Sequence, residues 1–91
     1  MAKIIIVGQC KDPVQWEKGF RTHTELFKRQ TTTKVSYAVA EGNHIAVCFE
    51  PQDVAAALKT LDSPETAQAM ETDGFLQDTA KIFVLEKEFN V

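Results

Sequence analysis

The 91-residue sequence is poor in the residues that form disulfide frameworks, zinc sites and nucleotide-binding loops. Its two cysteines, Cys10 and Cys48, form no Cys-x-x-Cys pair, which predicts reduced thiols rather than a disulfide or a zinc site. Neither Gly-x-Gly-x-x-Gly nor a P-loop occurs. No Ser/His/Asp or Cys/His set is visible, although such a set can assemble in space alone. We therefore expect neither a metal nor a cofactor.

Basic charge and long hydrophobic runs are also scarce. Ten basic against thirteen acidic side chains give a net charge of -3, which disfavours nucleic acid and anionic lipid as partners. Residues 45–49 are not the aromatic, basic strand of an RNA-recognition module. The longest uninterrupted apolar runs, residues 45–49 and 54–58, are far shorter than the roughly 20 residues that span a bilayer, and no secretory signal is recognised. We therefore expect a cytoplasmic protein that binds neither nucleic acid nor membrane.

The composition is that of an ordinary globular domain with one core. With 44% hydrophobic and 25% charged residues, the chain predicts a single domain over residues 1–91. Residues 3–10 are β-branched and apolar without alternation, which is typical of a strand covered on both sides. This segment is therefore predicted to be central in a sheet.

A helix is predicted directly after this strand. Asp12 is suited to the N-cap, Pro13 to the first helical position, and Gln15 to a capping box. The helix is expected to end near Arg29, and its inner face carries residues at steps of four, three and four: Trp16, Phe20, His23 and Phe27. The pattern predicts one continuous helix with an aromatic stripe against the sheet.

Residues 34–50 read as two β-rich runs around a two-residue loop, Gly42-Asn43, which is a hairpin signal. This loop places Tyr37 opposite Cys48. Successive side chains of a strand point to opposite faces. One face then carries Ile45, Val47 and Phe49, and the other carries Val35, Tyr37, Val39, Ala46 and Cys48. Because both faces are apolar, both are expected to be buried.

The second half predicts a broken helix and a last strand. One helical piece starts near Asp53, another restarts at Ser63 with Pro64 behind it, and Gly74 ends it. Residues 75–79 are expected to be a connection and residues 81–89 a strand. With right-handed crossovers, this order predicts a ferredoxin-like α+β fold, βαββαβ. Its antiparallel sheet is ordered 4-1-3-2, with the helices on one face.

Helices on one face leave the second apolar face of the sheet bare. Such a patch is larger than a monomer normally exposes. A second copy of the chain, packed sheet to sheet about a two-fold axis, is the economical cover. The sequence therefore predicts a homodimer through sheet faces.

Several segments together carry a resemblance to a known superfamily. They are residues 11–13 (KDP), residues 16–20 (WEKGF) with His23, residues 47–50 (VCFE), residues 63–70 and residues 74–75. In these the chain resembles the dimeric α/β-barrel superfamily, which includes antibiotic biosynthesis monooxygenase-like proteins, and more closely a small, functionally uncharacterised branch of it. The resemblance implies a homodimer with a helix–sheet cavity in each subunit. It implies no substrate, because the superfamily hosts oxygenases, isomerase-like and decyclase-like enzymes and haem-handling proteins.

His23 is the candidate catalytic residue, because it lies among aromatic side chains on the predicted inner face, where a general base can meet a cavity. A histidine hydrogen-bonded to a backbone group or to solvent fits the same pattern. Trp16, Phe20 and Phe27 are candidate walls of a ligand pocket, or simply core. Tyr37 is a candidate ligand contact, or a residue of the dimer interface.

Two function classes follow from these residues. In the first, the protein handles a small, largely apolar ligand in the helix–sheet cavity, as a cofactor-independent monooxygenase- or isomerase-like enzyme with His23 as acid or base. In the second, the protein is a non-catalytic homodimer that binds another protein. A cavity of a few hundred cubic ångströms at His23 favours the first, and a filled cavity favours the second.

Overall fold

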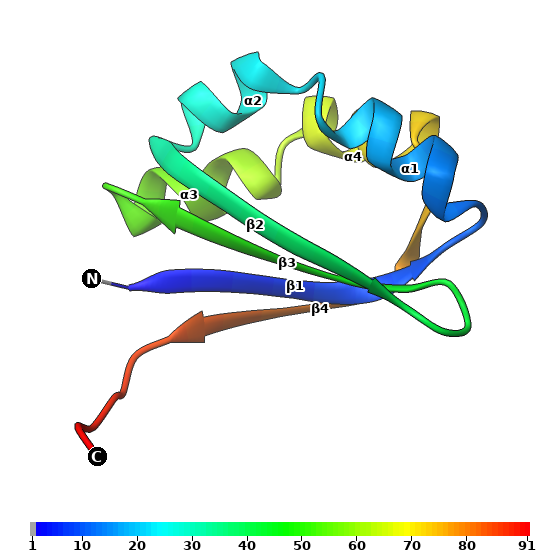
Figure 1. Cartoon of the computed structure of the whole chain (residues 1–91). Coiled ribbons are helices and arrows are strands. Elements are labelled where there is room, and N and C mark those ends of the chain that lie inside the picture. Colours follow the sequence, from blue (N-terminus) through cyan, green and yellow to red (C-terminus); the bar gives the residue numbers. More distant parts are fainter. Residues whose placement is uncertain (1) are drawn as a thin grey trace.

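A computed structural model describes residues 2–91. Four strands form one antiparallel sheet in the order β2-β3-β1-β4, and four helices lie together on one of its faces (Figure 1). This confirms the predicted ferredoxin-like α+β fold. In chain order the elements are β1 (Lys3–Cys10), α1 (Pro13–Phe20), α2 (Thr24–Arg29), β2 (Thr32–Ala40), β3 (His44–Pro51), α3 (Val54–Leu61), α4 (Pro64–Thr72) and β4 (Phe75–Leu85).

The central strand β1 is flanked by β3 and β4, as its unbroken apolar run predicts. Its alternate side chains Ile4, Ile6 and Cys10 are buried beneath the helices. Those between them, including Ile5 and Val7, lie on the opposite face and are only partly buried. The pattern follows from the period-two geometry of a strand, because apolar residues at every position reach both faces.

The predicted single helix up to Arg29 is wrong, because the chain forms α1 and α2 with a turn between them. The predicted start is correct: Oδ1 of Asp12 accepts hydrogen bonds from the backbone N–H groups of Val14 and Gln15. The break follows Gly19, a poor helix former. Both the backbone N–H and the hydroxyl of Thr22 donate to the carbonyl of Gly19, at 3.0 and 2.6 Å, and close a tight turn there.

The predicted hairpin is present, but its register differs by one residue from the prediction. The loop has three residues, 41–43, of which Gly42 and Asn43 are left-handed, with φ of 77° and 58°. The loop is held against the end of β1, because the carbonyl of Asn43 accepts a hydrogen bond from the N–H of Cys10 at 3.0 Å. With three residues in the loop instead of two, Tyr37 pairs with Val47 and not with Cys48.

The one-residue shift turns every β2 side chain to the other face of the sheet. Val35 and Tyr37 consequently lie on the helix side, paired with Phe49 and Val47. Val39 pairs with Ile45 and lies on the same side. The predicted assignment of Val35, Tyr37 and Val39 to the face of Cys48 is therefore wrong.

The second helix is broken, as predicted, into α3 and α4, with caps from Asp53 and Ser63. The last strand begins earlier than residue 81, because β4 starts at Phe75, directly after the left-handed Gly74 (φ 76°). A bulge interrupts its pairing with β1, and the hydroxyl of Thr79 accepts a hydrogen bond from the backbone N–H of Gln9 there. Residues 86–91 extend away from the sheet (Figure 1).

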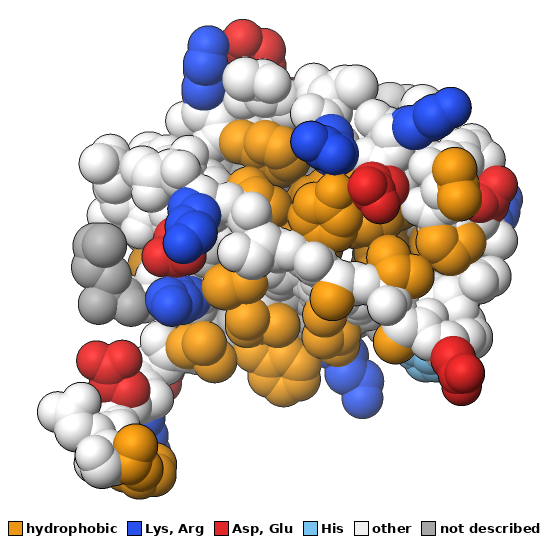
Figure 2. All heavy atoms as spheres, viewed as in Figure 1, with side chains coloured by type: hydrophobic (Ala, Val, Ile, Leu, Met, Phe, Trp, Pro, Cys, Tyr) orange, Lys and Arg blue, Asp and Glu red, His pale blue; other side chains and the backbone are white. Residues whose placement is uncertain are grey.

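The core lies between the helices and one face of the sheet. Its buried hydrophobic residues are Ile4, Ile6, Cys10, Trp16, Ile45, Val47, Phe49, Ala57 and Phe75. We call the opposite face of the sheet the open face, defined by the side chains of Ile5, Val7, Ala38, Ala46, Cys48, Phe83 and Leu85. Phe83 and Leu85 are about half exposed there. In Figure 2, hydrophobic side chains are visible both between the helical layer and the sheet and beneath the sheet. Within residues 2–91, no helix is long and apolar enough to cross a membrane.

Candidate functional site

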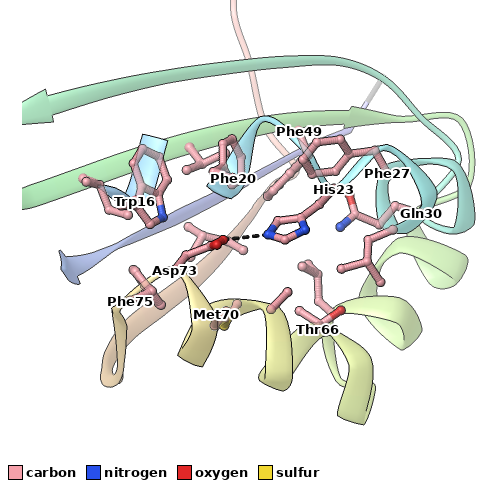
Figure 3. Close-up of a pocket in the computed structure, with 16 residues that line it drawn as sticks. Trp16, Phe20, His23, Phe27, Gln30, Phe49, Thr66, Met70, Asp73 and Phe75 are labelled. Carbon is pink, nitrogen blue, oxygen red and sulfur yellow. Dashed lines mark hydrogen bonds and ion pairs between the residues drawn. The ribbon is translucent and has the colours of Figure 1, made fainter. Parts of the chain in front are cut away.

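A cavity of about 60 Å³ lies between the helices and the sheet and reaches His23 (Figure 3). Most of its walls are apolar, and α1, α2, α4 and the sheet all contribute to them. Ligand pockets usually measure about 300–1,000 Å³, and a water molecule occupies about 30 Å³ of liquid. The cavity is therefore neither filled by side chains nor as large as the few hundred cubic ångströms that favour ligand handling outright.

His23 lies at the turn between α1 and α2, as the N-cap residue of α2, and not in the middle of a longer helix. Its backbone N–H donates to the carbonyl of Phe20 at 3.3 Å. Its ring nitrogen Nε2 lies 2.6 Å from Oδ2 of Asp73, and its side chain is 21% exposed. The partner of the ring is thus a carboxylate rather than the backbone group or solvent that the sequence leaves open.

Asp73 is the functional candidate that the sequence analysis missed. It follows the last residue of α4 as its C-cap, precedes Gly74, and keeps its side chain 6% exposed. Its carboxylate lies against Gly19 of α1, where any added Cβ would overlap Oδ1. A signal was available, because an acidic residue at a helix C-terminus is opposed by the helix dipole. Such a residue is a candidate for an interaction outside the helix, although Asp62 holds the same position at the end of α3 and is exposed.

The His23–Asp73 pair defines which ring nitrogen is free to react. An ionised carboxylate only accepts hydrogen bonds, so Nε2 carries the proton that Asp73 binds. In the neutral ring, Nδ1 is then an acceptor, and it points away from Asp73 (Figure 3). The arrangement can accept a proton at Nδ1 and stabilise the resulting imidazolium through Asp73.

The predicted aromatic residues form one connected cluster at the cavity. The rings of Trp16 and Phe20 are stacked with centroids 4.7 Å apart, and Phe27 meets Phe20 edge to face at 5.4 Å. All three line the cavity. Tyr37 packs behind them, with its centroid 5.6 Å from that of Trp16 and 5.7 Å from that of Phe20. It is therefore a support of the wall on the helix side, away from the open face.

Two buried polar residues at the cavity were not anticipated from the sequence. Thr66 is 5% exposed, and its hydroxyl donates to the carbonyl of Thr60 at 2.6 Å. Gln30 is 2% exposed, and its Oε1 accepts a hydrogen bond from the hydroxyl of Thr32 at 2.9 Å. Polar residues in helix termini give no periodic signal, so only the folded arrangement shows that they face a cavity.

No family model matches the chain, and no curated protein matches it in sequence. Solved structures do match it along nearly its whole length. SnoaB, a cofactor-independent oxygenase from Streptomyces nogalater, is 14% identical, with a TM-score of 0.72 and coverage of 99% of this chain and 95% of that one. A protein assigned to the antibiotic biosynthesis monooxygenases, from Bordetella bronchiseptica, is 11% identical, with a TM-score of 0.74 and 97% of both chains covered.

The chain has the fold of antibiotic biosynthesis monooxygenase-like proteins. The Arabidopsis thaliana protein At3g17210 shares this fold at 10% identity, with a TM-score of 0.70 and coverage of 100% of this chain and 99% of that one. At such identities the similarity establishes the fold and no activity. The fold predicted from the resemblance is thereby confirmed.

Proposed function

We propose that the protein binds a small, largely apolar molecule in the cavity between its helices and its sheet, and that His23 exchanges a proton with it. The observation that carries the proposal is the hydrogen bond between Nε2 of His23 and Oδ2 of Asp73, at 2.6 Å, on the wall of an otherwise mostly apolar cavity. A carboxylate-oriented imidazole at such a cavity has the composition of a general base.

The chemistry starts with transfer of a proton from an acidic C–H or O–H of the ligand to Nδ1 of His23. The negative charge of Asp73 stabilises the imidazolium that forms. Return of the proton to another atom of the ligand gives an isomerase-like reaction. Direct reaction of the ligand anion with O2 gives a monooxygenase-like reaction, RH2 + O2 → R=O + H2O. The shared fold with the cofactor-independent oxygenase SnoaB supports the second course.

The size of the cavity limits the ligand. About 60 Å³ holds a few non-hydrogen atoms, so a larger molecule needs side-chain movement. Met70 lines the cavity and is unbranched, with several accessible rotamers. Phe27 belongs to α2, which has only six residues. We therefore expect ligand binding to displace Met70 and α2 before it disturbs the sheet.

The proposal includes a homodimer through the open face. The apolar side chains at its centre, such as Ile5, Val7 and Cys48, are only partly buried within one subunit. Phe83 beside them is 50% exposed. Packing two such faces about a two-fold axis removes this surface from water and leaves both cavities on the outer, helical sides.

The experiment compares His23→Gln with the parent protein. A glutamine amide can still donate to Asp73, so the melting temperature should stay close to that of the parent, but glutamine is no base. Native mass spectrometry of the parent should show a co-purifying small molecule, and NMR in D2O should show deuterium entering it. The His23→Gln protein should lose this exchange by about a hundredfold or more, which is typical of removing a general base.

The matched variant is His23→Leu, which leaves the carboxylate of Asp73 without its partner. Its free energy of unfolding should fall by about 1–3 kcal/mol, because a buried acceptor is left unpaired. Deuterium exchange that is unchanged in His23→Gln would refute His23 as the base. A parent protein that carries no ligand and binds another protein through the open face would instead favour the non-catalytic role.

A further inference from the structure

Gln30 is a buried residue at the cavity, and only the oxygen of its side-chain amide is hydrogen-bonded within the described chain. Gln30 is 2% exposed, and its Oε1 is already bonded to the hydroxyl of Thr32. Among residues 2–91, no group accepts a hydrogen bond from its Nε2. Every fully enclosed polar side-chain atom in this range does have a partner. The free Nε2 is therefore accessible from the cavity that Gln30 lines.

Gln30 and His23 occupy the two ends of the same short helix. His23 is the N-cap of α2 and Gln30 is its C-cap. Seven positions along a helix make nearly two turns, which returns both residues to the same side. Figure 3 shows the two side chains directed into the same cavity, with the amide nitrogen of Gln30 on the side toward His23.

A purely structural role does not account for this amide. The N–H groups of Nε2 face the cavity without an acceptor from the chain, whereas an apolar side chain of similar length would place no polar atom there. The hydroxyl of Thr32 fixes the orientation of the amide by its bond to Oε1 and directs Nε2 toward the cavity. The arrangement therefore indicates an acceptor that comes from outside the chain.

We propose that Nε2 of Gln30 donates a hydrogen bond to an oxygen of the ligand, and that this oxygen is the atom that gains negative charge when His23 removes a proton. The inference rests on the function proposed above and narrows it. Loss of a proton from the carbon beside a ketone, or from a phenol, leaves the electron pair of the broken bond delocalised onto oxygen. A fixed N–H donor stabilises that charge. The ligand is thus a small, mostly apolar enolisable ketone or phenol.

The test uses the full chain and two probes of the same shape, cyclopentanone and methylenecyclopentane, which differ only in the carbonyl oxygen. In ¹H–¹⁵N NMR spectra of the parent, cyclopentanone should shift the side-chain amide signal of Gln30, and methylenecyclopentane should leave it in place. Gln30→Met should weaken cyclopentanone binding about tenfold and change methylenecyclopentane binding by less than about twofold.

The matched control is Gln52→Met, which makes the same change at an exposed glutamine outside the cavity. It should retain cyclopentanone binding within about threefold, and the backbone amide spectrum reports whether each variant folds. Gln30→Glu serves as the second variant. An ionised carboxylate has no N–H to donate, so this variant should weaken cyclopentanone binding at least as much as Gln30→Met does.

Two kinds of result would overturn the inference. Binding of both probes in the cavity without a shift of the Gln30 amide, or an equal loss of both in Gln30→Met, would refute the role of Gln30 and leave the proposed function standing. Failure of both probes to bind in the cavity of the parent would refute the proposed function and the inference together.

Discussion

Ile4 and Ile5 are identical neighbours in β1, yet their side chains lie in different surroundings. Ile4 is fully buried beneath the helices, whereas Ile5 is only partly buried on the open face. The same contrast runs through β3, where Ile45, Val47 and Phe49 are buried and the residues between them, Ala46 and Cys48, are only partly buried. The sheet therefore carries apolar side chains on both of its faces, and the helices of the same chain cover only one of these faces.

This difference separates the residues that form the core of the chain from those that its own helices leave uncovered. The helix side forms a continuous core from Ile4 to Phe75, which also contains the wall of the cavity. The open face contributes little to this core, because nothing in one subunit packs on it. In the proposed homodimer, a second sheet would cover these apolar residues.

The largest expected effect is that of Ile4→Ala. Removal of a fully buried isoleucine side chain should lower the free energy of unfolding by about 2–5 kcal/mol, since it leaves a cavity in the core. The matched change Ile5→Ala should cost about 1 kcal/mol in a monomer, because its side chain is partly solvated already. Urea denaturation monitored by circular dichroism measures both.

Repeating both measurements at several protein concentrations tests whether the open face is an interface. If the open face forms the dimer interface, the cost of Ile5→Ala should grow with concentration, whereas that of Ile4→Ala should not. Equal costs for both substitutions at every concentration would contradict the distinction between the two faces.

The next effect concerns the dimer itself and compares Phe83 with Ile82. Both are 50% exposed neighbours in β4, but Phe83 lies on the open face and Ile82 on the other side. Phe83→Lys should raise the dimer dissociation constant by a factor on the order of one hundred, because an unpaired ammonium would be desolvated in the interface. Ile82→Lys should change it by less than about threefold, since its side chain lies on the helix side, outside the proposed interface.

Analytical ultracentrifugation over a range of concentrations measures both constants. A parent protein that remains a monomer at micromolar concentration would end the dimer proposal. Dissociation by Ile82→Lys as strong as that by Phe83→Lys would place the interface elsewhere.

The arrangement of strands and helices could be predicted because it depends on local patterns. The apolar run of β1 indicates a central strand, and Asp12 and Ser63 are caps that side-chain chemistry makes recognisable. The hairpin register could not be predicted from the pair Gly42-Asn43, because the folded loop also includes Glu41 and is held by a long-range bond from the N–H of Cys10 to the carbonyl of Asn43. A one-residue difference there reversed the face assigned to Tyr37.

The site was predictable only in part for the same reason. His23 is recognisable by its aromatic neighbours at helical spacing, although the helix breaks just before it. Its partner Asp73 is fifty positions away in sequence, and only the folded structure brings it to Gly19 and the imidazole ring. Gln30 is detectable only once the cavity is known, since its identity as a buried donor depends on what surrounds it.

The smallest expected effect is a difference in alkylation rate between two thiols, that of Cys10 beneath the helices and that of Cys48 on the open face. Burial raises the pKa of the Cys10 thiol, and the nearby carboxylate of Asp12 raises this pKa further. Iodoacetamide reacts with the thiolate, so alkylation of Cys10 should be slower than that of Cys48 at pH 8. If two open faces pair, protection of Cys48 should also grow with protein concentration, while the rate at Cys10 should stay constant.

The same pKa shift predicts a pH dependence of stability. Because the folded pKa of Cys10 lies above its unfolded value, the unfolded thiol ionises first as the pH rises. The stabilisation is therefore complete below the unfolded pKa of about 9.0 and is lost as the pH rises through the folded value. Between pH 8 and pH 10, the free energy of unfolding of the parent should fall more steeply than that of Cys10→Ala. Parallel pH profiles for the two proteins, or alkylation of Cys10 as fast as that of Cys48, would show that the buried face is open to solvent near Cys10.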